Sequence, residues 1–293
     1  MMQRYNGHYY RSADDRLNLY ARDYNENSGG IPILMMHGLT RNSADFENIA
    51  DVLRHKHRLI VPDQRGRGRS DYDPDPDNYT PQVYAQDMFA LLQSLGIEQV
   101  IFMGTSMGGL IAMLMIASKA DIARALILND IGPEVATDGL ARLQGYVGKP
   151  VKIANWDDAA EHCRKTNEQS FPDYGDDDWM AFAHRTCITD ENDIPKLAYD
   201  MAISQGVQGD KPTAAPPDLW PVWDMMSQIP ALAIRGQESD ILLPTTLQKM
   251  KAGHSGYFSA IEIPGRGHAP MLDELAAVEA IGSFLDAILS NKI

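Results

Sequence analysis

Cysteine is almost absent from this sequence, since only Cys163 and Cys187 occur in 293 residues. Two thiols without metal-like spacing cannot form the disulfide framework of a small secreted domain or a zinc cluster. We therefore expect both to be reduced thiols in a cytoplasmic protein. The chain also lacks any His, Cys and Asp grouping with ligand spacing, which predicts chemistry without a metal or a cofactor.

Basic residues are also scarce, with 26 Lys and Arg against 40 Asp and Glu and a net charge of −14. Nucleic acids and anionic membrane surfaces need clustered basic side chains, so this balance argues against both as partners. The longest apolar run, Leu110–Ala117, is far shorter than the roughly 20 residues that span a bilayer. Residues 1–15 contain no apolar segment typical of a secretory signal. These absences favour a small-molecule partner.

What the chain does contain is an alternation of short apolar runs with helical patterns. The runs end in Gly, Asp or Asn and lack the polar alternation of a half-exposed strand, which is typical of strands buried on both faces of a parallel sheet. We expect such strands at residues 31–38, 57–63, 99–104, 123–130, 230–236 and 259–265, with helices beginning at Ser43, Pro81, Ser106 and Asp273. Residues 9–24 alternate instead and predict an antiparallel hairpin at the sheet edge.

One long segment, residues 133–228, interrupts this rhythm. It shows no buried-strand pattern, and it holds all four tryptophans of the chain, Trp156, Trp179, Trp220 and Trp223. We interpret it as a helical lid inserted into an α/β core made of residues 1–132 and 229–293. Most of the four rings are expected to fill the small core of this lid.

A serine stands at a position where a buried strand should meet a helix. Residues Gly104–Gly108 fit the pattern G-x-S-x-G, with Ser106 at its centre. In this context the glycines permit a tight strand-to-helix turn that exposes the serine hydroxyl at the carboxyl end of the sheet. The start of the helix adds free N–H groups and a positive dipole end. The motif predicts a nucleophilic serine.

Such a serine needs a base, and the base needs an acid to orient it. His268 follows the last predicted strand, and Asp240 follows the strand before it. The carboxyl ends of parallel strands meet at one edge of a sheet, so we expect both side chains near Ser106. By residue type alone, the alternatives are His37, His55, His57 and His162 for the base and Glu238 and Asp130 for the acid. Asp130 also ends a strand at this edge, where a loop-capping role is the alternative.

The loop after the first buried strand provides the remaining part of a site. The backbone N–H groups of Leu39 and Met107 are expected to form an oxyanion hole. Arg41 lies two residues further on and is a candidate for binding a substrate carboxylate. His37 is a second candidate substrate contact, although a structural role in holding this loop is favoured.

These motifs resemble the α/β-hydrolase superfamily over nearly the whole chain outside the lid. The glycine-rich block Asp63–Ser70, "DQRGRGRS", is similar to a turn in its esterase, dehalogenase and epoxide-hydrolase members, where the Arg and Gly residues are mostly structural. The resemblance implies a mostly parallel, twisted eight-stranded sheet with helices on both faces and a lid after the sixth strand. It also implies the nucleophile, acid, base and oxyanion donors named above. Serine at the elbow argues against branches that use a carboxylate nucleophile.

The sequence therefore predicts a serine hydrolase that cleaves small, largely hydrophobic esters or lactones through an acyl-enzyme. Trp179 and Trp220 of the lid are candidate substrate contacts. A carbon–carbon bond hydrolase of ring-cleavage diketones is the main alternative, because it would use the same triad. A proline-type aminopeptidase is less favoured, since Gly175–Asp178 is the only candidate acidic subsite for an amine. A non-catalytic ligand-binding protein of this fold is the alternative from another class.

Overall fold

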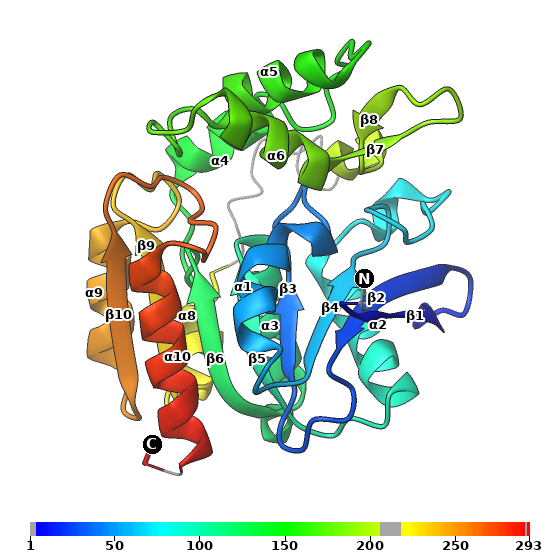
Figure 1. The fold of residues 1–293 in the computed structure, drawn as a ribbon. Coiled ribbons are helices and arrows are strands. Elements are labelled where there is room, and N and C mark those ends of the chain that lie inside the picture. Colours follow the sequence, from blue (N-terminus) through cyan, green and yellow to red (C-terminus); the bar gives the residue numbers. More distant parts are fainter. Residues whose placement is uncertain (1–3, 206–217, 291) are drawn as a thin grey trace.

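A computed structural model describes residues 4–205, 218–290 and 292–293. Within these residues an eight-stranded sheet runs in the order β1-β2-β4-β3-β5-β6-β9-β10 through the centre of the molecule (Figure 1). The strands are β1 (Asn6–Arg11), β2 (Asn18–Tyr24), β3 (Ile33–Met36), β4 (Leu59–Asp63), β5 (Val100–Thr105), β6 (Ala123–Asn129), β9 (Ala231–Gly236) and β10 (Phe258–Ile263). The hairpin of β1 and β2 is antiparallel, as is the pairing of β2 with β4, and the remaining pairs are parallel. The predicted strands and edge hairpin are confirmed.

The central strands consist of apolar residues because both faces of the sheet are covered. Every residue of β3, β4 and β5 is buried. Figure 1 shows helices in front of and behind the sheet. The core helices are α1 (Glu47–Leu53), α2 (Pro81–Ser94), α3 (Met107–Ser118), α8 (Trp220–Met225), α9 (Pro244–Gly253) and α10 (Leu275–Leu289).

Two separate apolar clusters correspond to the two faces. One joins α1 and α10 to alternate strand residues such as Ile33 and Met35. The other joins α2, α3, α8 and α9 to the intervening residues, including Leu34 and Met36. This alternation follows from the two-residue repeat of a strand, and it makes the sheet a rigid base for the loops at its carboxyl edge.

Helix α2 illustrates how the local sequence sets these elements. Thr80 accepts a hydrogen bond from the Val83 N–H and caps the helix, and Pro81 occupies the first turn, where its missing N–H costs nothing. Tyr84, Met88 and Leu91 then recur at helical spacing and are buried. The helix therefore packs along α3, which begins directly after Ser106.

A lid covers the carboxyl edge of the sheet (Figure 1). Its elements are α4 (Thr137–Gln144), α5 (Trp156–Asn167), α6 (Asp176–Thr186), and the short hairpin of β7 (Cys187–Thr189) and β8 (Pro195–Leu197). Trp179, Phe171 and Phe182 fill a separate small core within it. The hairpin differs from the helical pattern expected here, because each strand is too short to give a recognisable alternation.

The last part of the segment expected to form the lid packs differently. Helix α8 lies against α3, and the fully buried Trp223 belongs to the cluster on the sheet. The expectation that most of the four tryptophans fill the lid core is therefore wrong. Trp156 and Trp179 pack in that core, whereas Trp220 and Trp223 pack with the cluster on the sheet. Residues 206–217 of the expected lid lie outside the described residues.

Backbone hydrogen bonds hold the lid to the core at several places. The Gly68 N–H donates to the Ala198 carbonyl at 2.8 Å, and the Asp200 N–H donates to the Gly66 carbonyl at 2.8 Å. On the other side, the Gly267 N–H donates to the Ser170 carbonyl at 3.0 Å. The lid thus contacts the glycine-rich turn and the loop that carries His268. Among the described residues, the helices are too short or too polar to cross a bilayer.

Candidate active site

Ser106 forms a strained elbow between β5 and α3. Its φ and ψ angles are 50° and −116°, a conformation in which the hydroxyl points out of the turn. The neighbouring glycines make this turn possible, since a Cβ on Gly108 would lie 2.0 Å from the Met36 carbonyl oxygen. The Ser106 N–H is satisfied by the Asn129 carbonyl at 3.0 Å. The expected strand–serine–helix geometry is present.

His268 bridges this serine to a buried carboxylate. Its Nε2 lies 2.8 Å from Ser106 Oγ, and its Nδ1 lies 2.8 Å from Asp130 Oδ2. Asp130 has no exposed surface, and its carboxylate also accepts hydrogen bonds from the Gly236 N–H and the Ser239 hydroxyl. A serine, an imidazole and a carboxylate are therefore linked in one chain of hydrogen bonds, which is the arrangement that activates a serine hydroxyl.

The carboxylate that binds His268 is Asp130 and not the expected Asp240, which faces the lid. Arg142 of α4 donates two hydrogen bonds to Asp240, at 2.6 and 2.9 Å. Burial acts to raise the pKa of Asp240, but the hydrogen bonds and charge of Arg142 outweigh it and hold that pKa below its usual value. The expected contact between Asp240 and His268 is thus corrected: Ser239, one residue earlier, is buried and donates its hydroxyl to Asp130. The other alternative, Glu238, is exposed to solvent.

The loop expected to provide the oxyanion donors approaches the serine. A Cβ on Gly38 would lie 3.8 Å from the Ser106 Cβ, and Gly38, Leu39 and Ser106 line one cavity. Met107 is the first residue of α3, and its N–H therefore has no acceptor within the helix. This geometry is compatible with an oxyanion hole made by these two amides.

His37 is a structural part of the same loop. Its side chain is fully buried, with Nδ1 2.7 Å from the Gly38 carbonyl and Nε2 accepting a hydrogen bond from the Gln64 N–H at 3.1 Å. Burial lowers the pKa of His37 to about 3, so the ring is neutral near pH 7. With both nitrogens engaged by backbone, His37 is not placed to contact a substrate.

A small cavity of about 50 Å³ lies beside Ser106 and His268. Arg41, Tyr146 and Asn167 line it, and they also line an adjoining cavity of about 30 Å³ beneath the lid. Small-molecule sites usually enclose roughly 300–1,000 Å³, so the lid covers this site closely.

The candidate substrate contacts in the lid lie elsewhere. Trp179 is buried in the lid core, and the indole N–H of Trp220 donates to Glu134 at 2.9 Å. Among the described residues that line the cavity beside Ser106, neither ring is present. Both are corrected as substrate contacts because their apolar faces pack against neighbouring side chains.

Two solved or curated relatives resemble this chain over most of its length. An alpha/beta hydrolase structure from Novosphingobium aromaticivorans matches with a TM-score of 0.90 and 38% identity, covering 98% of this chain and 99% of that one. The 3-hydroxybutyrate-oligomer hydrolase of Cupriavidus necator is 32% identical over 258 residues, which are 86% of this chain and 87% of the relative.

A third relative is more distant. The 2-(acetamidomethylene)succinate hydrolase of Mesorhizobium japonicum is 26% identical over 265 residues, 89% of this chain and 90% of the relative. The family model described as the alpha/beta hydrolase family matches residues 33–281. The eight-stranded sheet and these matches agree with the resemblance seen in the motifs, and the chain belongs to the alpha/beta hydrolase family.

Proposed function

We propose that this protein is a serine hydrolase that cleaves short carboxylic esters through an acyl-enzyme. The observation that carries the proposal is the chain of two 2.8 Å contacts from Ser106 Oγ through His268 to Asp130. That chain provides a nucleophile, a general base and a group that orients the base. The burial of Asp130 limits competition from water for its contact with the imidazole.

In the proposed reaction, Ser106 Oγ attacks the ester carbonyl carbon while its proton passes to His268 Nε2. The carbonyl oxygen becomes negatively charged, and the N–H groups of Leu39 and Met107 stabilise it. The imidazolium, stabilised by Asp130, then gives its proton to the departing alcohol. Water repeats the sequence on the acyl-enzyme, releasing the acid and restoring the serine.

The substrate class that we propose is a short ester of a hydroxy acid that carries a free carboxylate. Two relatives support this choice, because a 3-hydroxybutyrate oligomer ends in a carboxylate and a succinate derivative carries two. Both relatives match over more than four-fifths of this chain.

Arg41 is the residue that we propose binds this carboxylate. Among the described residues that line the two cavities, Arg41 is the one Arg or Lys side chain. Its guanidinium stacks 4.1 Å above the Phe182 ring of α6. Asp45 accepts one of its five N–H donors at 2.8 Å. The remaining donors suit a planar carboxylate, and the stacking holds the guanidinium in a fixed orientation.

Replacing Arg41 with methionine should lower kcat/KM for a 3-hydroxybutyrate dimer with a free carboxylate by about 10- to 100-fold, the range for loss of a charge-assisted hydrogen bond. The methyl ester of the same dimer should react within about threefold of the wild-type rate, because it offers no charge to bind. Steady-state kinetics on both substrates measures the change in preference.

Asp45→Asn is the matched control for Arg41→Met. If Arg41 serves only to pair with Asp45 and hold the loop, the two variants should show the same kinetic defect. If Arg41 binds the substrate, Asp45→Asn should keep or increase the preference for the free acid, because an opposing negative charge is removed. An unchanged preference in Arg41→Met contradicts the proposed anion site.

A substrate panel tests the proposed function itself. The panel compares p-nitrophenyl acetate and butyrate, the 3-hydroxybutyrate dimer, a butyrolactone and a ring-cleavage diketone. We expect turnover of the esters, with the dimer acid preferred over neutral esters of equal size. Turnover of the diketone without any ester would replace the proposal with carbon–carbon bond hydrolysis, and binding without turnover would favour a non-catalytic member of the fold.

A further inference from the structure

Arg67 of the glycine-rich turn is a buried arginine that, among the residues described by the structure, has no charged hydrogen-bond partner. Its side chain is fully buried. Among the residues that the structure describes, its hydrogen-bond partners are the carbonyls of Leu39 and Arg65, the Tyr84 hydroxyl and the Met107 sulfur, all of them neutral. Burying an unpaired cation costs several kcal/mol, so a purely structural account of this side chain leaves a large penalty unexplained.

The contacts of Arg67 converge on the two residues of the proposed oxyanion hole. Its Nε–H donates to the Leu39 carbonyl at 3.0 Å, and its Nη2 lies 3.9 Å from Met107 Sδ. The N–H and the carbonyl of Leu39 belong to adjacent peptide planes, so holding the carbonyl restricts the rotation that would turn the N–H away. One side chain thus contacts both residues whose N–H groups form the proposed oxyanion hole, through the carbonyl of one and the sulfur of the other.

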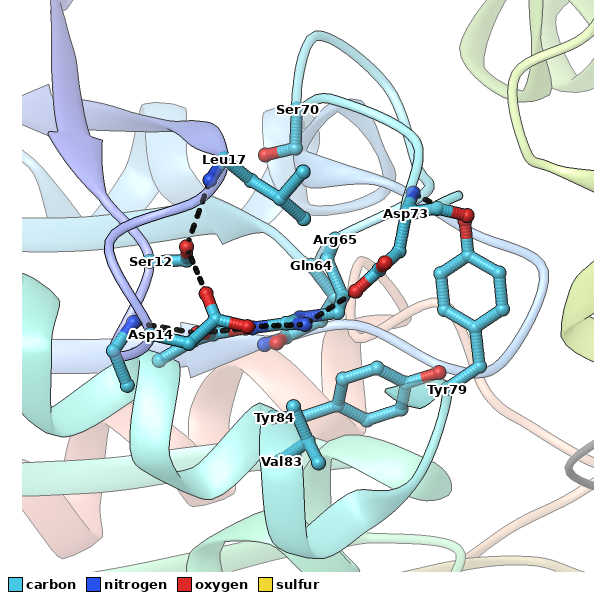
Figure 2. Close-up of polar contacts among 12 residues, drawn as sticks. Ser12, Asp14, Leu17, Gln64, Arg65, Ser70, Asp73, Tyr79, Val83 and Tyr84 are labelled. Carbon is cyan, nitrogen blue, oxygen red and sulfur yellow. Dashed lines mark hydrogen bonds and ion pairs between the residues drawn. The ribbon is translucent and has the colours of Figure 1, made fainter. Parts of the chain in front are cut away.

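The turn that carries Arg67 is held by a buried ion-pair network centred on the neighbouring Arg65. Figure 2 shows Arg65 extended between Asp14 and Asp73 beneath this turn. Arg65 donates to Asp73 at 2.6 Å and to Asp87 at 2.7 and 2.8 Å, and all three of these side chains are fully buried. Such a buried and paired network favours a single backbone position for the next residues.

The same turn is also fixed by its glycines. Gly66 and Gly68 have φ angles of 74° and 56°, and a Cβ on Gly68 would lie 2.3 Å from an oxygen of Asp63. The guanidinium of Arg67 lies 4.9 Å from the Tyr84 ring centroid and 5.6 Å from that of Tyr79, which holds its plane. The Arg67 Nε–H that donates to the Leu39 carbonyl is therefore held in a fixed position by the turn.

We infer that Arg67 is a positioning residue for the oxyanion hole: it holds the Leu39 peptide so that its N–H points at the developing oxyanion, and its buried positive charge favours that oxyanion. This inference rests on the proposed function. Electrostatic stabilisation of this kind acts mainly on the transition state, because the ground-state carbonyl carries little charge. The effect of losing Arg67 should therefore fall on kcat rather than on KM.

Arg67→Met and Arg67→Lys test the inference, with Arg69→Met as the matched control. Arg69 lies in the same turn, is exposed and contacts Tyr20 rather than the site. The rate per active site, counted from the p-nitrophenol burst, should fall about 10- to 100-fold in Arg67→Met, below the 10²- to 10³-fold loss of a direct donor. KM should stay within about twofold. Arg67→Lys keeps the positive charge but loses the planar guanidinium, so its rate per active site should lie between those of the wild type and Arg67→Met.

A trifluoromethyl ketone gives a second readout that a general folding defect would not reproduce. Ser106 Oγ adds to its carbonyl carbon, the proton passes to His268, and the oxygen becomes the bound oxyanion. Its affinity should fall by the same factor as kcat in Arg67→Met, while the affinity of butyrate, a ground-state competitor, should change less than twofold.

The inference is overturned if the per-site rate and ketone affinity of Arg67→Met match those of Arg69→Met, or if the whole loss is a loss of active sites. Should Arg67→Met fail to fold, the same criteria apply to Arg67→Lys, whose ammonium keeps the cation in place. An absence of ester turnover and of a burst in the wild type would instead contradict the proposed function.

Discussion

Ser106→Ala should lower kcat for short esters by about 10⁴- to 10⁶-fold, to a residual rate that comes from the oxyanion donors and binding alone. The change removes the oxygen that attacks the carbonyl, so no acyl-enzyme can form. His268 remains in place through its contact with Asp130. The fold should be unaffected, because the backbone N–H of residue 106 keeps its bond to the Asn129 carbonyl. Stopped assays with p-nitrophenyl butyrate, together with covalent labelling by a fluorophosphonate, measure the loss.

Ser118→Ala is the control for this variant. Ser118 is the last residue of α3, the helix that begins directly after Ser106. It is exposed and donates its hydroxyl to the Leu114 carbonyl at 2.9 Å. It should retain wild-type turnover and labelling. If Ser106→Ala turns over esters as fast as Ser118→Ala does, the serine is not the nucleophile, and a ligand-binding role becomes the better account of the site.

The sheet, the elbow and the position of His268 beside Ser106 could be predicted because each depends on local pattern. The apolar runs that end in Gly, Asp or Asn identify the parallel strands, and the order of strands places their carboxyl ends at one edge. Ser106 and His268 follow two of these strands, and the structure brings them to 2.8 Å. Ser106 follows β5 and His268 follows β10, with β6 and β9 between them in the sheet, so loops at one edge can meet without following adjacent strands.

The partner of His268 could not be predicted in the same way, since Asp130 and Asp240 both follow parallel strands. The choice depends on the exact turn after β9, where the Ser239 N–H bonds to the Gly236 carbonyl at 3.0 Å and the next residue faces outward. It also depends on Arg142 of the lid, which binds Asp240. Neither the turn nor the lid contact leaves a periodic pattern in the sequence.

Composition was equally uninformative about individual lid residues. Trp223 lies within the segment expected to form the lid, yet its ring is buried against α3 and its indole N–H donates to the Met250 carbonyl at 3.1 Å. Arg67 belongs to a motif whose glycines have evident roles in the turn. Its contact with Leu39 depends on how two loops approach each other across β3 and β4, which is a tertiary property.

Asp130→Asn should lower kcat by about 10³- to 10⁴-fold, because it leaves His268 in the wrong tautomer. In the native site one carboxylate oxygen accepts the Gly236 N–H at 2.9 Å, and the other faces His268 and the Ser239 hydroxyl. The Gly236 N–H can only donate, so it selects the amide orientation with oxygen toward Gly236 and NH₂ toward His268. His268 Nδ1 must then accept a hydrogen bond, and its proton moves to Nε2. The ring can no longer take the proton of Ser106.

Asp240→Asn distinguishes the two carboxylates. Its pair with Arg142 is partly exposed, with 26% and 34% of the side chains accessible, so the variant should lose less than about 1 kcal/mol of stability and less than about tenfold in kcat. The two variants are compared by kcat and by thermal unfolding. A larger loss in Asp240→Asn than in Asp130→Asn would return the acid to Asp240 and require the loop after β9 to rearrange during turnover. A larger loss in Asp130→Asn is expected if Asp130, which is buried and held by two other donors, orients the imidazole. Only that carboxylate then controls which imidazole nitrogen carries the proton.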